Sequence, residues 1–224
     1  LLVQARVDGV DCFLFDLGVS SPQLDIPERG FSYHEDAPLD MRMNPGNNTL
    51  TAAEVINTYN EADLARIIRA FGDEKHASRI ARQICRRRDK QPIETTLELV
   101  DVIKAAIPAA DRRHGGHPAR KTFQALRIEV NHEMDALREL LEGSLKVLRP
   151  GGRLVVLTYH SLEDRMVKNF IKAGNIDGKV EQDFFGNRLS PFAAGNNKVI
   201  VPSEAEQAEN PRSRSAKLRI AEKK

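Results

Sequence analysis

The sequence contains no tryptophan and only two cysteines, Cys12 and Cys85, among its 224 residues. Two cysteines cannot form a disulfide framework or a four-ligand zinc site, and Cys12 lies in an apolar segment where we expect a small buried side chain. No apolar run approaches the ~20 residues that a membrane helix needs. The opening residues 1–6 lack the pattern of a signal peptide. These absences predict a cytoplasmic protein without a disulfide scaffold or a membrane segment.

The sequence also lacks internal repeats and the glycine-rich fingerprint of dinucleotide-binding proteins, which argues against a Rossmann dehydrogenase. No glycine-rich nucleotide loop precedes the first apolar segment, so we expect the chain to begin inside a domain. The length suffices for one substantial domain, or for a domain with an insertion.

Charge is distributed unevenly, although 34 basic residues nearly balance 32 acidic ones. Basic side chains cluster in three runs, and such clusters can neutralise the phosphates of nucleic acids. The alternative for any one run is a solvated surface. The runs comprise Arg79, Arg82, Arg86, Arg87, Arg88 and Lys90; Arg112, Arg113, His114, His117, Arg120 and Lys121; and Arg212, Arg214, Lys217, Arg219, Lys223 and Lys224.

A strand covered on both faces is predicted at residues 10–16, because Val10, Phe13, Leu14 and Phe15 are apolar. Asp16 ends this strand, and a turn rich in glycine, serine and proline follows. Ligands of open α/β sheets bind outside the carboxyl ends of the strands. Asp16 is therefore a candidate site residue; the alternative is that it only caps the loop.

Residues 26–50 predict a long irregular loop, whose mixture of Arg29, Phe31, Tyr33, Asp40 and Arg42 suits the clamping of a planar or phosphorylated ligand. Residues 51–107 predict four short amphipathic helices that begin near Thr51, Asn60, Ala77 and Thr95. Arg79, Arg82 and Arg86 share a helix face away from the apolar stripe. This block suggests a helical subdomain inserted between two α/β segments.

The later part of the chain predicts a polar loop at 109–116 and helical periodicity from Pro118 to 148, broken near Asn131. A Pro-Gly-Gly turn at 150–152 precedes a second apolar strand at 154–159, with a helix at 162–173 after it. Such a unit belongs to a parallel sheet. Short strands are expected at 199–201 and 216–221.

Several motifs stand in order along almost the whole chain: FDLGVSSPQLD at 15–25, RGFS at 29–32, PLDMRM at 38–43, HPARKTFQALRI at 117–128, HSLEDR at 160–165 and NPRSRS at 210–215. With shorter matches at 72–74, 80–82, 130–131 and 150–153, they resemble the family of bacterial methyltransferases that modify the N4 of a cytosine in 16S ribosomal RNA.

This resemblance implies an α/β, class I (Rossmann-like) methyltransferase that uses S-adenosylmethionine and carries an inserted all-helical subdomain. We therefore expect the methyltransferase core at 1–45 and 114–224 and an insertion for RNA recognition at 46–113. The expected partner is the 16S RNA of the small ribosomal subunit, methylated in its decoding region. By the same resemblance, Asp16 and Gln23 contact the cofactor. The oligomeric state is left open.

The sequence departs from the family at its start, where the family's Gly-Gly-His cofactor loop and ribose-binding acid have no counterpart. We expect this chain to bind S-adenosylmethionine weakly or not at all, and micromolar binding in isothermal titration would contradict this. The leading hypothesis is an RNA cytosine-N4 methyltransferase, and the alternative is a non-catalytic ribosomal RNA-binding module.

Catalysis is expected at the two strand ends, where Ser21 and His160 are the candidate catalytic residues. Residues 16–23 take the place of the turn that amino-methyltransferases use to hold the target amine, but no aromatic residue stands in it. Phe31, Tyr33 and Tyr159 are candidates for stacking on the base, or pack ordinarily. His160 and Ser161 alternatively cap the following helix, with Glu163 and Asp164 near its start.

RNA contacts are expected from Arg79, Arg82 and Arg86, together with Arg120 and Lys121. A metal site is not expected. His114, His117 and His132 lack a known ligand spacing and are better read as a polar surface.

Overall fold

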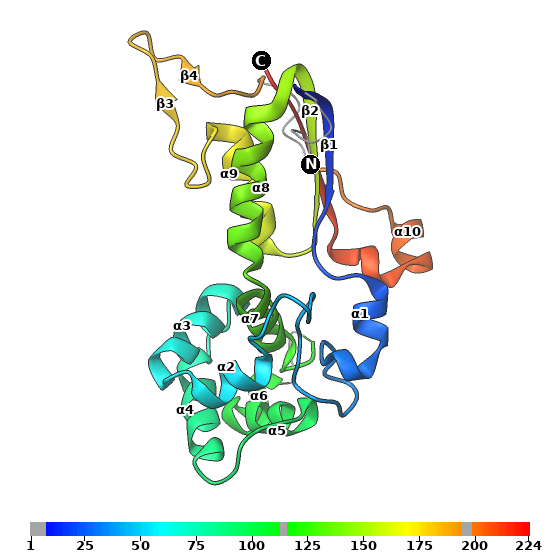
Figure 1. Ribbon diagram of the computed structural model, residues 1–224, viewed down its shortest axis with the longest axis vertical. Helices are drawn as coiled ribbons and strands as arrows, with labels where there is room; N and C mark the ends of the chain where they lie inside the picture. Colours follow the sequence, from blue (N-terminus) through cyan, green and yellow to red (C-terminus); the bar gives the residue numbers. More distant parts are fainter. Residues whose placement is uncertain (1–7, 113–115, 194–198) are drawn as a thin grey trace. The chain divides into compact units, whose positions relative to one another are not determined.

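The computed structural model describes residues 8–112, 116–193 and 199–224. The chain forms two compact units (Figure 1): a sheet unit of Leu1–Gly18 with Met134–Lys224, and a helical unit of Val19–Glu133. The packing thus divides the chain at 18/19 and 133/134. The expected boundaries at 45/46 and 113/114, between the methyltransferase core and the helical insertion, remain a prediction.

The sheet unit contains a mixed sheet with the strand order β1-β2-β5. β1 (Val10–Asp16) runs parallel to β2 (Leu148–Thr158), and β5 (Lys217–Glu222) runs antiparallel to β2. These strands confirm the three main strands expected. β2 begins at Leu148 rather than near residue 154, because the residues of the expected Pro-Gly-Gly turn belong to the strand. The register between β1 and β2 shifts at this point.

The prediction that β1 is covered on both faces is wrong. Leu14 is 70% exposed and Cys12 is exposed, whereas Phe13 and Phe15 on the opposite face pack against the core. Successive side chains of a strand point to opposite faces, so a core on one side leaves the other uncovered. Among the described residues β1 pairs only with β2. Cys12 is therefore not the buried side chain that its apolar neighbours suggested.

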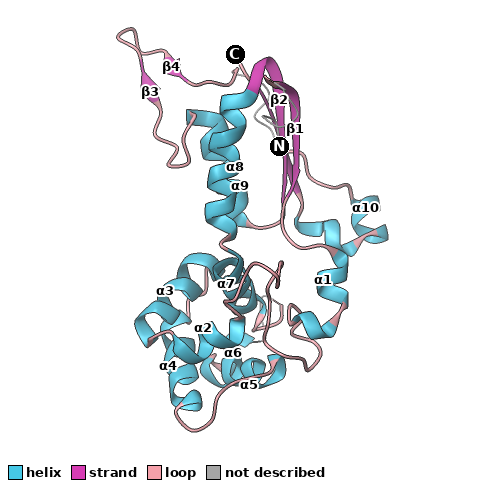
Figure 2. Ribbon diagram, in the orientation of Figure 1, coloured by secondary structure: helices cyan, strands magenta, loops and turns pink. Residues whose placement is uncertain are grey.

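Two helices run alongside the strands of this unit (Figure 2): α8 (Glu133–Val147) and α9 (Ser161–Ala173). They share one hydrophobic cluster with β2, which includes Leu141, Val156 and Phe170. The predicted break near Asn131 is confirmed, because His132 takes a left-handed conformation with φ of 50° between α7 (Arg120–Asn131) and α8.

Shorter elements complete the sheet unit. The expected strand at 199–201 is reduced to one bridge between Ile200 and Leu218. The others are β3 (Glu181–Gln182), β4 (Arg188–Leu189), α10 (Glu204–Glu209) and the 3₁₀ helix η2 (Pro211–Ser215).

The helical unit holds only helices and loops within its described residues, with one isolated bridge between Pro38 and Thr95. Its elements are α1 (Ser21–Asp25), the 3₁₀ helix η1 (Pro27–Arg29), α2 (Ala52–Thr58), α3 (Glu61–Gly72), α4 (Ala77–Arg88), α5 (Thr96–Ala106), α6 (Ala109–Arg112) and α7 (Arg120–Asn131). The four helices expected between residues 51 and 107 are confirmed. α6 is a single turn inside the expected polar loop.

Local signals explain why these helices begin where they do. Thr51 and Thr95 accept hydrogen bonds from the backbone N–H of Glu54 and Glu98, whose carboxylates bond back to the caps. Asn60 caps α3 by accepting a hydrogen bond from the backbone N–H of Asp63. The apolar faces then form one core, with Ile67, Ile68 and Ile80 among its fully buried side chains. None of the described helices is long and apolar enough to cross a membrane.

Candidate functional site

The carboxyl ends of β1 and β2 bring Asp16 and Tyr159 together in the sheet unit. Asp16 lies opposite Leu157 in the parallel register, and the Tyr159 hydroxyl donates a 2.9 Å hydrogen bond to Asp16 Oδ1. Burial and the neighbouring carboxylate of Asp16 raise the pKa of Tyr159 to about 12. Tyr159 therefore stays protonated near neutral pH and orients an exposed carboxylate.

Gly18 follows Asp16 in the chain, and its φ of 87° is a left-handed conformation that suits glycine. A Cβ at Gly18 would lie 3.5 Å from the Tyr159 ring. Sequence reasoning found Asp16 and proposed Tyr159 only for stacking. It missed their hydrogen bond, because the two residues are 143 positions apart.

His160 occupies the N-cap of α9, as the capping alternative predicted. Its Nδ1 accepts from the backbone N–H of Glu163, and the Glu163 carboxylate accepts from the N–H groups of Tyr159 and His160. The His160 Nε2 lies 3.2 Å from Glu163 Oε1, and the side chain is only 9% exposed. Both ring nitrogens therefore lie next to Glu163, and these contacts account for the position of His160 as the N-cap. A catalytic role for His160 remains a prediction.

Asp164, which follows Glu163 in α9, connects this helix to β5. Its carboxylate accepts hydrogen bonds from Arg219 at 2.7 Å and from Lys217 at 3.2 Å. Burial raises the pKa of Asp164, but the bonds and charges of Arg219 and Lys217 outweigh burial and hold it below its usual value. Lys223 donates to the carbonyls of Leu145 and Leu148. Much of the third basic run thus stabilises the sheet unit rather than forming a free phosphate-binding patch.

Ser21 and Gln23 lie in the helical unit at the start of α1. The backbone N–H of Ser20 donates a 2.8 Å hydrogen bond to Gln23 Oε1, which closes the first turn of the helix. Ser21 is exposed in the first helical position. Within the described residues the Gln23 amide nitrogen has no hydrogen-bond partner, so it can donate to a ligand. The catalytic role of Ser21 and the cofactor role of Gln23 remain predictions.

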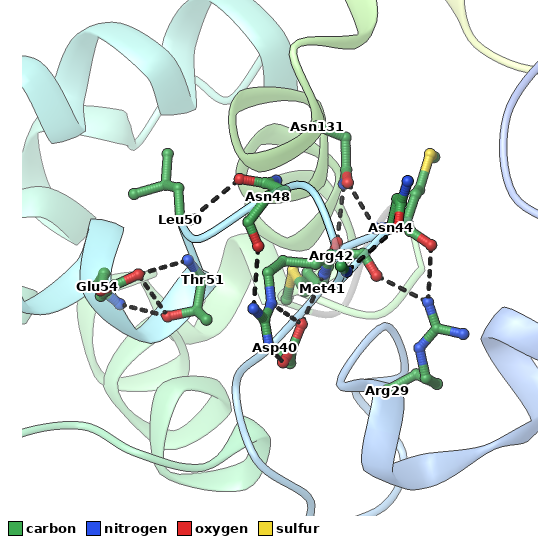
Figure 3. Close-up of polar contacts among 12 residues, drawn as sticks. Arg29, Asp40, Met41, Arg42, Asn44, Asn48, Leu50, Thr51, Glu54 and Asn131 are labelled. Carbon is green, nitrogen blue, oxygen red and sulfur yellow. Dashed lines mark hydrogen bonds and ion pairs between the residues drawn. The ribbon is translucent and has the colours of Figure 1, made fainter.

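The loop at 26–50 is held by its own hydrogen bonds (Figure 3), and its role in clamping a ligand remains a prediction. Arg29 donates to the carbonyls of Arg42 and Met43, and Arg42 forms paired bonds of 2.9 and 2.6 Å with Asp40. Burial raises the pKa of Asp40, but the Arg42 hydrogen bonds and nearby positive charges outweigh it and lower the pKa. The Arg42 guanidinium therefore bonds within the loop through all three of its nitrogens, and Arg29 bonds through one of its nitrogens.

Asn131, at the end of α7, fastens this loop to the helices. Its amide nitrogen donates to the carbonyl of Met41 at 2.8 Å, and its oxygen accepts from the N–H of Met43 at 2.7 Å. Met41 is fully buried with a φ of 60°, a conformation unusual for a residue with a side chain. The bonds from Asn131 hold the backbone on both sides of this strained residue.

Three arginines line one surface of α4, as expected. Arg79, Arg82 and Arg86 are exposed and border a cavity of about 220 Å³ with Gln83, Ala105 and Ala106. Arg82 contacts Glu61 at 3.4 Å. The neighbouring Arg87 and Arg88 instead donate to the carbonyls of Gln91 and Ile56. The structure thus separates the exposed arginines of this run from those that stabilise the fold.

Arg120 and Lys121 border another cavity of about 220 Å³, whose lining includes Lys75, His76 and His117. Arg120 is exposed, whereas Lys121 donates to the carbonyl of Asp73 at 2.7 Å. The cavity is lined by several basic side chains, although Lys75 and His76 both contact Asp111. RNA binding by Arg120 and Lys121 remains a prediction.

The aromatic candidates of the helical unit pack within it. Phe31 is 6% exposed, and the Tyr33 ring stacks on His117 with centroids 4.5 Å apart and an angle of 9°. Burial, helped by the charges of His34 and Lys104, lowers the pKa of His117. These contacts favour the packing alternative for both rings. Of the three histidines considered for a metal, His114 lies outside the described residues, and His132 ends α7.

Comparison with known proteins identifies relatives along the whole chain. The model of the MraW methylase family matches residues 1–224. Proteins named "Ribosomal RNA small subunit methyltransferase H" are 55% identical over 218 residues in Bacteroides thetaiotaomicron, 52% over 223 in a Paenibacillus species and 50% over 224 in Lactobacillus delbrueckii subsp. bulgaricus. The matches cover 97%, 97% and 99% of this chain and 70%, 70% and 71% of the relatives. The chain belongs to the MraW methylase family.

Proposed function

We propose that this protein is a class I methyltransferase that transfers a methyl group from S-adenosylmethionine to the exocyclic N4 of a cytosine in the decoding region of 16S ribosomal RNA. The observation that carries the reaction and the substrate is the similarity to relatives named as small-subunit ribosomal RNA methyltransferases. The assignment of N4 of a decoding-region cytosine as the target atom is based on the family resemblance of the sequence motifs. The cytoplasm is the compartment in which such a substrate is met.

The site supports this proposal through the pair of Asp16 and Tyr159. The Asp16 carboxylate is exposed, and Tyr159 occupies only one of its oxygens, so the other can accept a hydrogen bond from an amino or hydroxyl group of the cofactor. When bound, S-adenosylmethionine supplies a methyl group made electrophilic by its sulfonium centre.

The target amine is a poor nucleophile, because its lone pair is delocalised into the cytosine ring. The protein must therefore hold this nitrogen in line with the transferable methyl group, and hydrogen bonds to the amine can make it more tetrahedral. Ser21 and His160 are the proposed groups near the base, and Gln23 is proposed to donate its amide to the cofactor.

RNA binding is proposed for the helical unit. Arg79, Arg82 and Arg86 supply three exposed guanidinium groups along α4, and Arg120 and Lys121 supply further positive charge. Guanidinium groups bind phosphates with paired hydrogen bonds and remain charged at any physiological pH. These residues support a sequence-independent contribution to affinity from the RNA backbone.

Because weak cofactor binding is expected of this chain, the test incubates the protein with a high concentration of methyl-labelled S-adenosylmethionine and unmethylated small ribosomal subunits, and then identifies the labelled nucleoside by mass spectrometry. We expect N4-methylcytidine. Asp16→Ala should lower cofactor affinity or turnover about tenfold or more, since it removes hydrogen bonds to a charged acceptor. Asp11→Ala, on the same strand, serves as the matched control. Label on another atom would contradict the proposal, and RNA binding without any transfer would support the non-catalytic RNA-binding alternative.

A further inference from the structure

The NPRSRS motif at 210–215 forms the 3₁₀ helix η2 with its N-cap and leads directly into β5. In the antiparallel pairing of β5 with β2, Lys217 lies opposite Thr158, the last residue of β2. The motif therefore lies at the carboxyl end of β2, where Tyr159 follows the strand. Figure 1 shows this turn, between α10 and β5, at the end of the strands where β1 stops at Asp16.

The backbone of this motif is fixed by short-range hydrogen bonds. The Ser213 hydroxyl and the Ser213 N–H both donate to the carbonyl of Asn210, at 2.8 and 3.0 Å, and the Ser213 carbonyl accepts from the N–H of Ala216 at 2.7 Å. Ser213 is only 6% exposed, whereas its neighbours Arg214 and Ser215 are exposed. Their side chains are therefore presented on an ordered turn, which reduces the entropy cost of binding.

Arg214 is the basic side chain of this segment that the fold does not use. Residues 210–219 contain four basic side chains and no acidic one. Lys217 and Arg219 donate hydrogen bonds to one carboxylate of α9, and Arg212 also has an interaction partner. Arg214 forms no hydrogen bond or ion pair with any described residue. Its guanidinium donors are therefore available to an anion.

We propose that Arg214 binds a phosphate of the RNA substrate close to the target nucleotide, with the Ser215 hydroxyl as a second donor. The proposal rests on the proposed function, because it assumes an RNA whose target base enters at the pair of Asp16 and Tyr159. A guanidinium presents a planar fork of donors that matches phosphate oxygens, and serine hydroxyls bind them as well. Contacts of this kind fix the register of a strand, and the register decides which base reaches the pair.

Position favours an RNA phosphate as the anion. Arg214 precedes Lys217 by three residues, a span of at most ~11 Å, and Lys217 lies beside the end of β2. Phosphates follow one another every ~3.4 Å along a helical strand, so an RNA whose base reaches Tyr159 has several phosphates within such a span. The three glutamates of α10 lie within the described residues and form no ion pair with Arg214, so they do not neutralise it.

The first experiment measures binding of a fluorescein-labelled fragment of 16S ribosomal RNA that contains the decoding region, without cofactor and over a range of salt concentrations. Arg214→Gln should weaken binding about three- to tenfold. It should also reduce the slope of log affinity against log salt by about 0.7, the value of one phosphate contact on a single strand. Arg214→Lys keeps the charge and should keep the slope, but it lacks the fork and should lose part of the affinity.

Arg188→Gln provides the matched control. Arg188 is an exposed arginine on β4, also in the sheet unit and without an acidic partner among the described residues. Its replacement removes the same charge but should leave the affinity and the slope unchanged. Equal affinity and equal slope of the wild type and Arg214→Gln would overturn the proposal.

The second experiment identifies the phosphate. Methylphosphonate linkages, which carry no charge, replace the phosphates around the target cytidine one at a time. The wild type should lose affinity at each linkage that it contacts, and Arg214→Gln should be insensitive to one of these, because both changes remove the same interaction. A linkage next to the target cytidine is expected. If Arg214→Gln responds to every linkage as the wild type does, the phosphate assignment is wrong.

The cofactor carries a carboxylate, which is the other anion that a guanidinium fork matches. Methyl-transfer kinetics distinguish the two, because Arg214→Gln should raise KM for the RNA and leave KM for S-adenosylmethionine unchanged. The reverse pattern would overturn the proposal and assign Arg214 to the cofactor. If Arg214→Gln binds and methylates the RNA like the wild type, only the role of Arg214 fails. If the wild type neither binds nor methylates the RNA, the proposed function fails, and the role of Arg214 fails with it.

Discussion

Tyr159 shows how a single residue links the candidate site to stability. The folded protein raises its pKa from 10.0 to about 12, so the folded state holds this proton more tightly than the unfolded state. The resulting stability is fully present below pH 10 and is lost as the pH rises through about 12. Tyr159→Phe should remove this part of the pH dependence.

Ultraviolet titration of the three tyrosines measures this effect directly. Asp16→Asn should lower the pKa of Tyr159, because it removes the negative charge that opposes ionisation of the hydroxyl. Asp11→Asn provides the control, since Asp11 is exposed and contacts Arg149 instead. An unchanged titration of Tyr159 in Asp16→Asn would contradict the hydrogen bond between them.

Asn131 carries a second prediction at the residue scale. Asn131→Ala should lower the free energy of unfolding by about 2–4 kcal/mol, because half-buried backbone groups of Met41 and Met43 lose their partner. Asn131→Asp should also destabilise, since a carboxylate cannot donate to the Met41 carbonyl. Urea unfolding measures both, with Asn47→Ala as an exposed control in the same loop. A change below about 0.5 kcal/mol for Asn131→Ala would refute the anchoring role.

At the scale of elements, α4 carries two kinds of arginine: exposed ones that are candidates for RNA contacts, and others that donate to backbone carbonyls of the fold. Each phosphate contact that Arg79, Arg82 or Arg86 makes should add about 0.7–0.9 to the slope of log affinity against log salt. Replacing these residues by glutamate, one at a time, should weaken RNA binding and flatten that slope. Arg138→Glu, at an exposed position on α8, makes the same charge change elsewhere and should have a smaller effect. Equal slopes in the wild type and all three α4 variants would remove α4 from the RNA-binding surface.

Elements whose signals are local could be predicted from the sequence. The caps at Thr51 and Thr95 act over three residues, and the helices they start were found at nearly the right positions. The exposure of Cys12 and Leu14 depends on which face α8 and α9 cover, and no local pattern encodes this. The anchoring of the loop at 26–50 likewise depends on a distant residue. Its anchor, Asn131, is 90 positions from Met41, so the sequence alone could not reveal it.

At the scale of the whole molecule, the two units have separate hydrophobic cores, one containing Leu141 and the other Ile68. A chain of this kind departs from two-state unfolding when its units differ in stability. We expect calorimetry to resolve two transitions, each of which responds to changes in its own core. Leu141→Ala and Ile68→Ala remove fully buried side chains and should each cost about 2–5 kcal/mol.

For a unit of about 100 residues, this loss corresponds to a fall of roughly 10 °C or more in the midpoint of one transition. Leu141→Ala should lower the transition of the sheet unit, and Ile68→Ala that of the helical unit, while the other midpoint stays in place. Hydrogen exchange of amides in β2 and α3 assigns each transition to its unit. A single transition that both variants lower equally would mean that the two cores unfold as one. Binding of RNA would then stabilise the sheet unit as much as the helical unit, because ligand stabilisation acts on the whole cooperative unit that contains the binding site.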